Sequence, residues 1–98
     1  VLLFEPCYDS YVPVVRLAGG TPVFVSLRYP DYRVDWDAVR RAVTPRTRLV
    51  LVNTPHNPTG IAWTAADLAQ LSAIVDGTRT LIVADEVYEH VIFDGRTH

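Results

Sequence analysis

Four short runs of mainly apolar residues recur along this chain, and a helical pattern follows each of the first three. Strands are predicted at residues 1–4, 21–27, 48–52 and 80–84, and helices at residues 10–18, 35–43 and 64–75. Strands that alternate with helices form an α/β fold, because each helix returns the chain to begin another strand parallel to the last. The sequence therefore predicts a mostly parallel sheet with flanking helices, in a chain of 98 residues that forms one domain at most.

Local signals place the start of two of these helices. Asp35 can accept hydrogen bonds from the first turn of the helix that follows it. Thr64, with Asp67 three positions later, forms an approximate capping box. The apolar stripe of this third helix is expected to consist of Leu68, Leu71 and Val75, and to pack against the sheet.

Composition argues against several classes of protein. The formal net charge of -2 offers no positive surface for nucleic acid or an anionic membrane. No apolar run approaches the roughly 20 residues that span a bilayer. The histidines and the single cysteine show no metal-ligand spacing, so no metal site is expected. All nine basic residues are arginines, so chemistry that requires a lysine amine cannot be completed by this chain.

Three segments rich in polar and aromatic residues follow the first, third and fourth predicted strands. They read EPCYDSY (5–11), NTPHNPTG (53–60) and DEVYEH (85–90). Open α/β sheets bind their ligands outside the carboxyl ends of the strands. We therefore expect a binding site to be formed by these three segments together.

Asp85 directly follows four apolar residues, so its side chain is expected to be largely buried. A buried carboxylate is costly unless a cation or several donors meet it, and no arginine lies nearby in the sequence. Its partner is then either a set of backbone N–H groups in a following turn, or a remote cation or ligand. Tyr88 falls on the same side if the chain turns after Glu86. Taken alone, it is better explained as a half-buried aromatic residue with its hydroxyl in water.

The segment after the third strand is unusually restricted. The dipeptides Thr54-Pro55 and Asn57-Pro58 leave few backbone conformations, and Gly60 permits a positive φ. A tight turn into the next helix would explain any one of these residues, but such a turn needs only one proline or glycine. We therefore expect the loop to hold Asn57, whose amide both donates and accepts hydrogen bonds, in a fixed position.

Further expectations concern single residues of these segments. Cis peptide bonds are predicted at Asn57-Pro58 and at Glu5-Pro6, because only X-Pro bonds adopt this form at small cost. Tyr8 either lies flat on an aromatic ligand or packs beneath its own loop. His56 is expected to be an exposed turn residue, and Cys7 a small buried one. A single cysteine also fits a reducing cytoplasm.

With AGGTPVFVSL (18–27) between them, the segments EPCYDSY, LVLVNTPHNPTG (49–60) and DEVYEHVIFDG (85–95) closely resemble the class I and II aminotransferases. These are fold type I enzymes that use pyridoxal 5'-phosphate. The nearest branch resembles the methionine, glutamine and kynurenine aminotransferases, and the resemblance covers essentially the whole chain. NPTG followed by ADEVY about 25 residues later is a far more specific signal than NPTG alone.

The resemblance implies roles for four residues. Asp85 would pair with the protonated pyridine nitrogen of the cofactor, which keeps the ring electron-withdrawing. Asn57 and Tyr88 would hydrogen-bond the phenolic oxygen of the ring, and Asn57 would also meet the substrate carboxylate. Tyr8 would stack on the face of the ring. The implied reaction moves an amino group from an amino acid to a 2-oxo acid, in a cytoplasmic homodimer.

Parts that the family requires are missing from these residues. The family attaches its cofactor through a lysine, so this chain supplies no catalytic residue, and the arginine that binds the substrate carboxylate lies beyond His98 in the family. Because Val1 is not a natural start, residues 1–98 are expected to be an interior piece of the cofactor-binding large domain, inactive alone. Two alternatives stay open: a pyridoxal-phosphate-dependent carbon–sulfur β-lyase, and an aminotransferase-like effector domain of a transcriptional regulator.

Overall fold

The computed structural model describes all 98 residues, and its strands and helices alternate along the whole chain. The strands are β1 (Leu2–Glu5), β2 (Val23–Ser26), β3 (Leu49–Asn53) and β4 (Leu81–Asp85). The helices are α1 (Tyr11–Leu17), α2 (Trp36–Ala42) and α3 (Ala65–Val75). Each element overlaps the range predicted for it, and the α/β class is confirmed.

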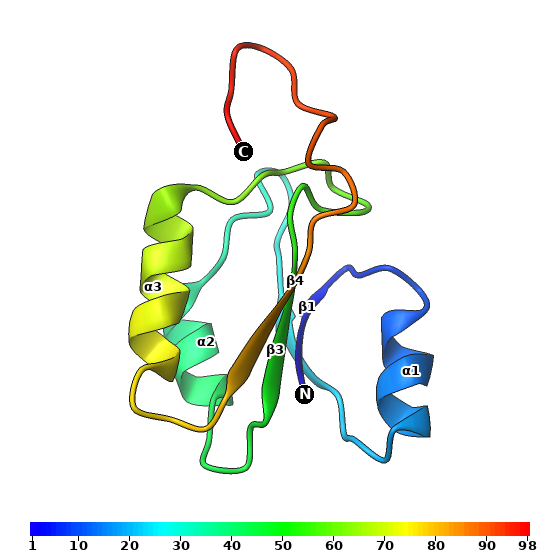
Figure 1. Cartoon of the computed structure of the whole chain (residues 1–98), viewed down its shortest axis with the longest axis vertical. Coiled ribbons are helices and arrows are strands. Elements are labelled where there is room, and N and C mark those ends of the chain that lie inside the picture. Colours follow the sequence, from blue (N-terminus) through cyan, green and yellow to red (C-terminus); the bar gives the residue numbers. More distant parts are fainter.

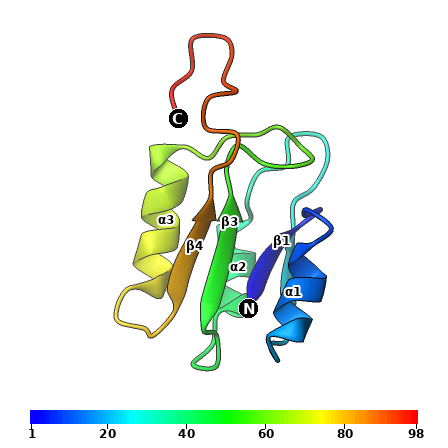
Figure 2. The ribbon, with the colours of Figure 1, turned by 45° about the vertical axis from the view of Figure 1, so that its right-hand side comes forward.

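The four strands form one parallel sheet in the order β2-β1-β3-β4. The chain steps from β1 to β2 in one direction, then crosses back past β1 to build β3 and β4 on its other side. Because crossovers between parallel strands are right-handed, α1 must lie on the opposite face of the sheet from α2 and α3. Figure 1 shows this arrangement, and Figure 2 shows β1, β3 and β4 side by side.

The main core lies between the sheet and the pair α2 and α3. Trp63, just before α3, packs edge-to-face on Phe4 of β1 and on Trp36 of α2, with ring centroids 5.0 and 5.6 Å apart. The other buried members of this cluster are Leu2, Val25, Leu27, Val39, Val50, Val52 and Leu71. Alternate residues of β1, β2 and β3 thus face the same two helices.

Both predicted helix starts are confirmed. The Asp35 carboxylate accepts hydrogen bonds from two N–H groups of the first turn of α2, and Thr64 and Asp67 form a complete capping box. The predicted stripe of α3 was partly wrong. Leu71 is fully buried, but Leu68 is half exposed because α3 is rotated so that other residues face the core. The residues of α3 that pack there are Leu71, Ile74 and Val75.

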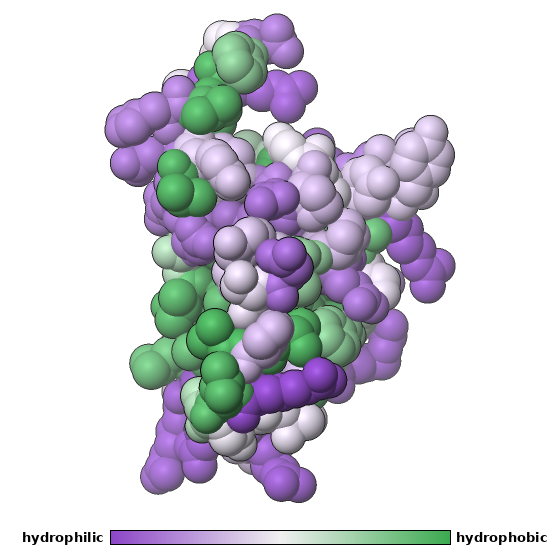
Figure 3. Space-filling view, turned by 90° about the vertical axis from the view of Figure 1, so that its right-hand side faces the viewer, coloured by the Kyte–Doolittle hydropathy of each residue, from purple (hydrophilic) through white to green (hydrophobic).

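Strand β4 is the least covered part of the sheet. It pairs with β3 on one side only, and Leu81, Ile82 and Val83 all remain substantially exposed. On the face of the sheet that carries α1, apolar surface reaches solvent in several places (Figure 3). No helix here has the length and apolar character that crossing a membrane requires.

Candidate functional site

The order of the strands reverses between β1 and β3, and a pocket of about 320 Å³ lies at the carboxyl ends of β1, β3 and β4. Such a switch point is where open α/β sheets bind their ligands, because the loops diverge there and leave a crevice. The four side chains predicted from the sequence all line it: Tyr8, Asn57, Asp85 and Tyr88. Three residues that were not predicted complete the wall: Tyr11, Asn53 and Val87.

Asp85 presents the one carboxylate of this pocket. It accepts a hydrogen bond of 2.5 Å from the Tyr11 hydroxyl and one of 3.3 Å from the backbone N–H of Val87. No basic side chain forms an ion pair with it. The expectation that Asp85 is largely buried was wrong, because β4 is an uncovered edge strand and leaves the side chain half-buried. The pocket therefore offers a negative charge that only neutral donors of this chain meet.

Tyr11 begins α1, lines the same pocket and donates its hydroxyl to this carboxylate. Burial, followed by the hydrogen bond to Asp85 and the charge of that group, raises the pKa of the Tyr11 hydroxyl far above its ordinary value. The hydroxyl is therefore protonated at neutral pH and acts as a donor.

Hydrogen bonds between separate parts of the loop after β3 hold it in place, which confirms that it is more than a simple turn. The backbone N–H of Asn57 donates to the side-chain oxygen of Asn53 at 2.8 Å, and that of Trp63 donates to the Thr54 hydroxyl at 2.9 Å. The N–H of His56 donates to the carbonyl of Ile61 at 2.8 Å. The loop geometry thus fixes the position from which Asn57 projects.

All the predicted cis peptide bonds are present, at Glu5-Pro6 and Asn57-Pro58. Two more occur at Tyr29-Pro30 and Thr54-Pro55, which the sequence did not lead us to expect. Two proline bonds of the loop after β3 are therefore cis.

His56 was predicted to be exposed, and this was wrong, since only 5% of the residue is accessible. Its Nδ1 shares a hydrogen bond of 2.6 Å with the Thr59 hydroxyl. Burial lowers the pKa of the ring, and a contact with the backbone carbonyl of Pro6 partly opposes the shift. A segment distant in the sequence therefore covers His56, and the residues next to His56 gave no indication of this burial.

Cys7 was expected to be buried and is half-buried. Burial, followed by the nearby charge of Glu5, raises the pKa of the Cys7 thiol.

Several polar groups in the pocket are unused within the chain. The side-chain hydrogen bonds of the pocket involve Tyr11, Asn53 and Asp85. They do not include the hydroxyls of Tyr8 and Tyr88 or the side-chain amide of Asn57. Tyr8 is 45% exposed and Tyr88 39% exposed. The Tyr8 ring packs edge-to-face on Tyr11, with centroids 5.6 Å apart. One carboxylate, one unbonded amide and open aromatic rings around a small pocket fit a flat, protonated aromatic ligand with polar groups on its rim.

Two residues that the sequence did not single out are central to this geometry. Asn53 and Tyr11 both stand in segments expected to form the site, at the end of β3 and the start of α1. Their positions at the carboxyl edge of the sheet could have identified them as candidate site residues. Both side chains contact Asp85, which lies far from each of them in the sequence.

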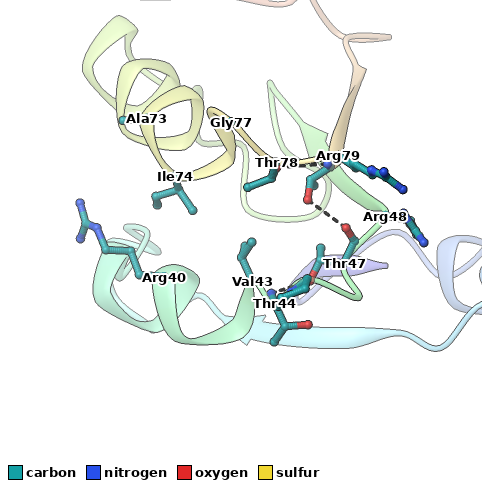
Figure 4. Close-up of a pocket in the computed structure, with 12 residues that line it drawn as sticks. Arg40, Val43, Thr44, Thr47, Arg48, Ala73, Ile74, Gly77, Thr78 and Arg79 are labelled. Carbon is teal, nitrogen blue, oxygen red and sulfur yellow. Dashed lines mark hydrogen bonds between the residues drawn. The ribbon is translucent and has the colours of Figure 1, made fainter.

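A larger cavity of about 800 Å³ lies at the opposite end of the sheet, between the carboxyl ends of α2 and α3 (Figure 4). Its polar groups do not converge. The Thr80 hydroxyl is bound to the carbonyl of Thr47 at 2.9 Å, and the side chains of Arg48 and Arg79 extend away from its centre. It therefore lacks the inward-facing polar groups of a specific binding site.

One surface cluster brings potential metal ligands together. The side chains of Glu86, Glu89 and His98 place ligand atoms within 4.8 Å of one another, and all three residues are exposed. Exposed acidic groups gather in this way without binding an ion, so we assign no site there.

Comparison with known proteins gives a consistent result. The sequence profile of the family "Aminotransferase class I and II" matches residues 1–97. The probable N-succinyldiaminopimelate aminotransferase DapC of Mycobacterium tuberculosis is 52% identical over 101 residues, which cover 100% of this chain and 25% of that protein. The methionine aminotransferase of Escherichia coli is 43% identical over 98 residues, again 100% of this chain and 25% of that protein.

A solved structure agrees with this. YbdL from Escherichia coli, identified as a methionine aminotransferase, superposes with a TM-score of 0.95 at 42% identity, covering 99% of this chain and 26% of that one. The chain thus spans about a quarter of the length of the relatives that it matches. These relatives are aminotransferases by name, so neither the β-lyase nor the regulator alternative is favoured.

Proposed function

This chain belongs to the class I and II aminotransferases, and on that premise we propose that its full-length protein moves an amino group from an amino acid to a 2-oxo acid. Its relatives depend on pyridoxal phosphate, which supplies, when bound, the electron-withdrawing ring that carries the amino group between the two substrates. The observation that supports the proposal is the convergence of Tyr8, Asn57, Asp85 and Tyr88 on one pocket at the switch point of the sheet.

In this proposal Asp85 holds a proton on the pyridine nitrogen of the cofactor. A carboxylate favours the protonated form of a nearby base, and the pocket offers no competing cation from this chain. Tyr11 and the backbone N–H of Val87 hold the carboxylate in one orientation, because each donates to a different oxygen. Asp85 is therefore the residue through which this chain acts on the electronics of the ring.

Asn57, Tyr88 and Tyr8 would position the same ring. The free amide of Asn57 and the Tyr88 hydroxyl can hydrogen-bond its phenolic oxygen and so stabilise negative charge there. The Asn57 amide would also meet the substrate carboxylate. The exposed ring of Tyr8 offers a flat surface on which an aromatic ring can stack.

Several features of the full-length protein belong to the proposal. Residues 1–98 would be part of the cofactor-binding large domain, and the lysine that attaches the cofactor would come from outside them, because they contain none. The enzyme would act as a homodimer in the cytoplasm, as the resemblance implies and as the single cysteine fits. The uncovered β4 edge is consistent with further strands in the complete domain.

The test uses the full-length protein, reconstituted with pyridoxal phosphate and supplied with a panel of amino acids and 2-oxo acids. We expect a visible absorbance band from the bound cofactor, and formation of the amino acid that corresponds to the 2-oxo acid. A protein that neither binds the cofactor nor transfers the amino group would contradict the proposal. A cofactor-dependent release of thiol without amino transfer would favour the β-lyase.

A further inference from the structure

Asn53 is the last residue of β3, and its side chain is directed into the pocket region rather than into the apolar core. Only 5% of the residue is accessible. A buried amide must have both its oxygen and its nitrogen satisfied, so the partners of Asn53 are informative.

The two ends of this amide contact two different residues of the proposed cofactor site. The Oδ1 atom accepts a hydrogen bond of 2.8 Å from the backbone N–H of Asn57, and the Nδ2 atom donates one of 3.0 Å to the backbone carbonyl of Asp85. Asn53 and Asp85 also face each other in the β3–β4 register. One planar amide therefore links the loop that carries Asn57 to the strand that carries Asp85.

The link to Asn57 has few substitutes. The N–H of Asn57 bonds only to Asn53, and no other backbone hydrogen bond of the loop includes Asn57. Pro58, the next residue, has no N–H to donate. The carbonyl of Asp85 has a second partner, the backbone N–H of Thr54 at 3.1 Å. Loss of Asn53 would therefore leave the Asp85 carbonyl with one hydrogen bond, but would leave the N–H of Asn57 with none.

We propose that Asn53 is a positioning residue, which sets the separation between the Asn57 amide and the Asp85 carboxylate and thereby fits both to one ring. The inference rests on the proposed cofactor site. It assigns to Asn53 no contact with the cofactor and no proton transfer. Its effect passes through Asn57 above all, because that residue has no other backbone anchor.

The experiment compares two buried side-chain bridges between the same pair of strands in the full-length protein. Asn53→Leu removes both hydrogen bonds at the carboxyl ends and keeps the number and branching of the side-chain heavy atoms. Thr80→Val is the matched control, because the Thr80 hydroxyl bridges to the Thr47 carbonyl near the amino ends, away from the pocket. Both variants lose a buried bridge, so a purely structural effect would appear in both.

Three readouts separate positioning from general stability. Asn53→Leu should weaken binding of pyridoxal phosphate roughly tenfold, the size expected from one or two lost hydrogen bonds. It should move the pH midpoint of the bound cofactor's absorbance change in the same direction as Asn57→Ala does. It should also speed amide hydrogen exchange across residues 53–60 of the cofactor-free protein. Thr80→Val should change none of these three.

The inference is overturned if Asn53→Leu keeps the wild-type affinity, pH midpoint and exchange, or if Thr80→Val changes them equally. Should Asn53→Leu fail to fold, Asn53→Ser is judged by the same three readouts. The exchange measurement needs no cofactor. A wild-type protein that binds no pyridoxal phosphate would therefore reject the proposed function, while the exchange of residues 53–60 would still decide whether Asn53 anchors the loop.

Discussion

The hydroxyl of Tyr11, the first residue of α1, donates a hydrogen bond of 2.5 Å to the carboxylate of Asp85, the last residue of β4. The two residues are 74 positions apart in the sequence. The contact ties the helix that follows β1 to the strand at the far edge of the sheet. It also orients the carboxylate that faces the pocket, since the second oxygen accepts the N–H of Val87.

Replacing Tyr11 with Phe removes this donor and keeps the ring. In the full-length protein we expect cofactor affinity to fall about tenfold, because the Asp85 carboxylate loses a charge-assisted hydrogen bond that orients it. Hydrogen bonds to charged groups are stronger than those between neutral groups. Titration of the cofactor-free variant with pyridoxal phosphate measures the change. Tyr32→Phe is the control, because Tyr32 is also half-buried and its hydroxyl forms no hydrogen bond here. Equal affinities in the two variants would remove Tyr11 from the site.

Asp85→Asn removes the charge proposed to keep the pyridine nitrogen protonated. Turnover by the full-length enzyme should fall by orders of magnitude while its circular dichroism spectrum is unchanged, because a neutral amide no longer favours the protonated ring. Glu86→Gln removes an adjacent carboxylate that lies outside the pocket and should leave turnover near the wild-type value. Wild-type turnover in Asp85→Asn would contradict the proposed role of Asp85 at the pyridine nitrogen.

His56 should make stability depend on pH. Burial lowers the pKa of the folded ring below its ordinary value of 6.5, so the unfolded chain binds the proton more readily. The stabilising contribution is therefore complete above pH 6.5 and is lost as the pH falls through the folded pKa. The melting temperature of the full-length protein should decline as the pH falls below 6.5, and His56→Gln should flatten that decline. His90→Gln, at a side chain 92% exposed, should retain the wild-type slope. Identical slopes in all three proteins would contradict the assignment.

The capping box of α3 should contribute measurably to stability. Thr64→Ala removes the hydroxyl that accepts the N–H of Asp67, and should lower the free energy of unfolding by about 1 kcal/mol. Ser72→Ala, at an exposed position of the same helix, is the control and should have a much smaller effect. Urea unfolding of the full-length protein provides the measurement. A Thr64→Ala change no larger than that of the control would show that the cap is unimportant.

Residues 1–98 made alone should have no transaminase activity. They contain no lysine, so the amine that attaches the cofactor and moves the substrate proton is missing. The fragment should also be poorly stable, because β4 exposes Leu81, Ile82 and Val83 on an unpaired edge and a chain of this size has little core to spare. Purified fragment is supplied with pyridoxal phosphate, an amino acid and a 2-oxo acid, and the keto product is followed. Sustained turnover would show that the chemistry or the boundaries have been misread.

The local features of this protein were readable from its sequence. The caps at Asp35 and Thr64 involve residues within three positions. The cis bonds at Asn57-Pro58 and Glu5-Pro6 were predicted at X-Pro dipeptides, although two further X-Pro bonds are cis without having been expected. The polar segments after the strands also followed from order along the chain, because parallel strands present their carboxyl ends at one edge. The sequence therefore predicted that these segments form one site, and the four expected site residues do line one pocket.

Burial and long-range partners were decided only by the tertiary structure. His56 was predicted to be exposed but is buried, because the segment after β1 covers it. Asp85 was predicted to be largely buried but is half-buried, because β4 is an open edge of the sheet. Asn53 reaches the carbonyl of Asp85 only because β4 pairs with β3. Tyr11 reaches the Asp85 carboxylate only because the fold brings the start of α1 to the carboxyl end of β4. Hydrogen bonds and burial depend on which strands become neighbours, and that is a property of the assembled sheet rather than of any stretch of residues.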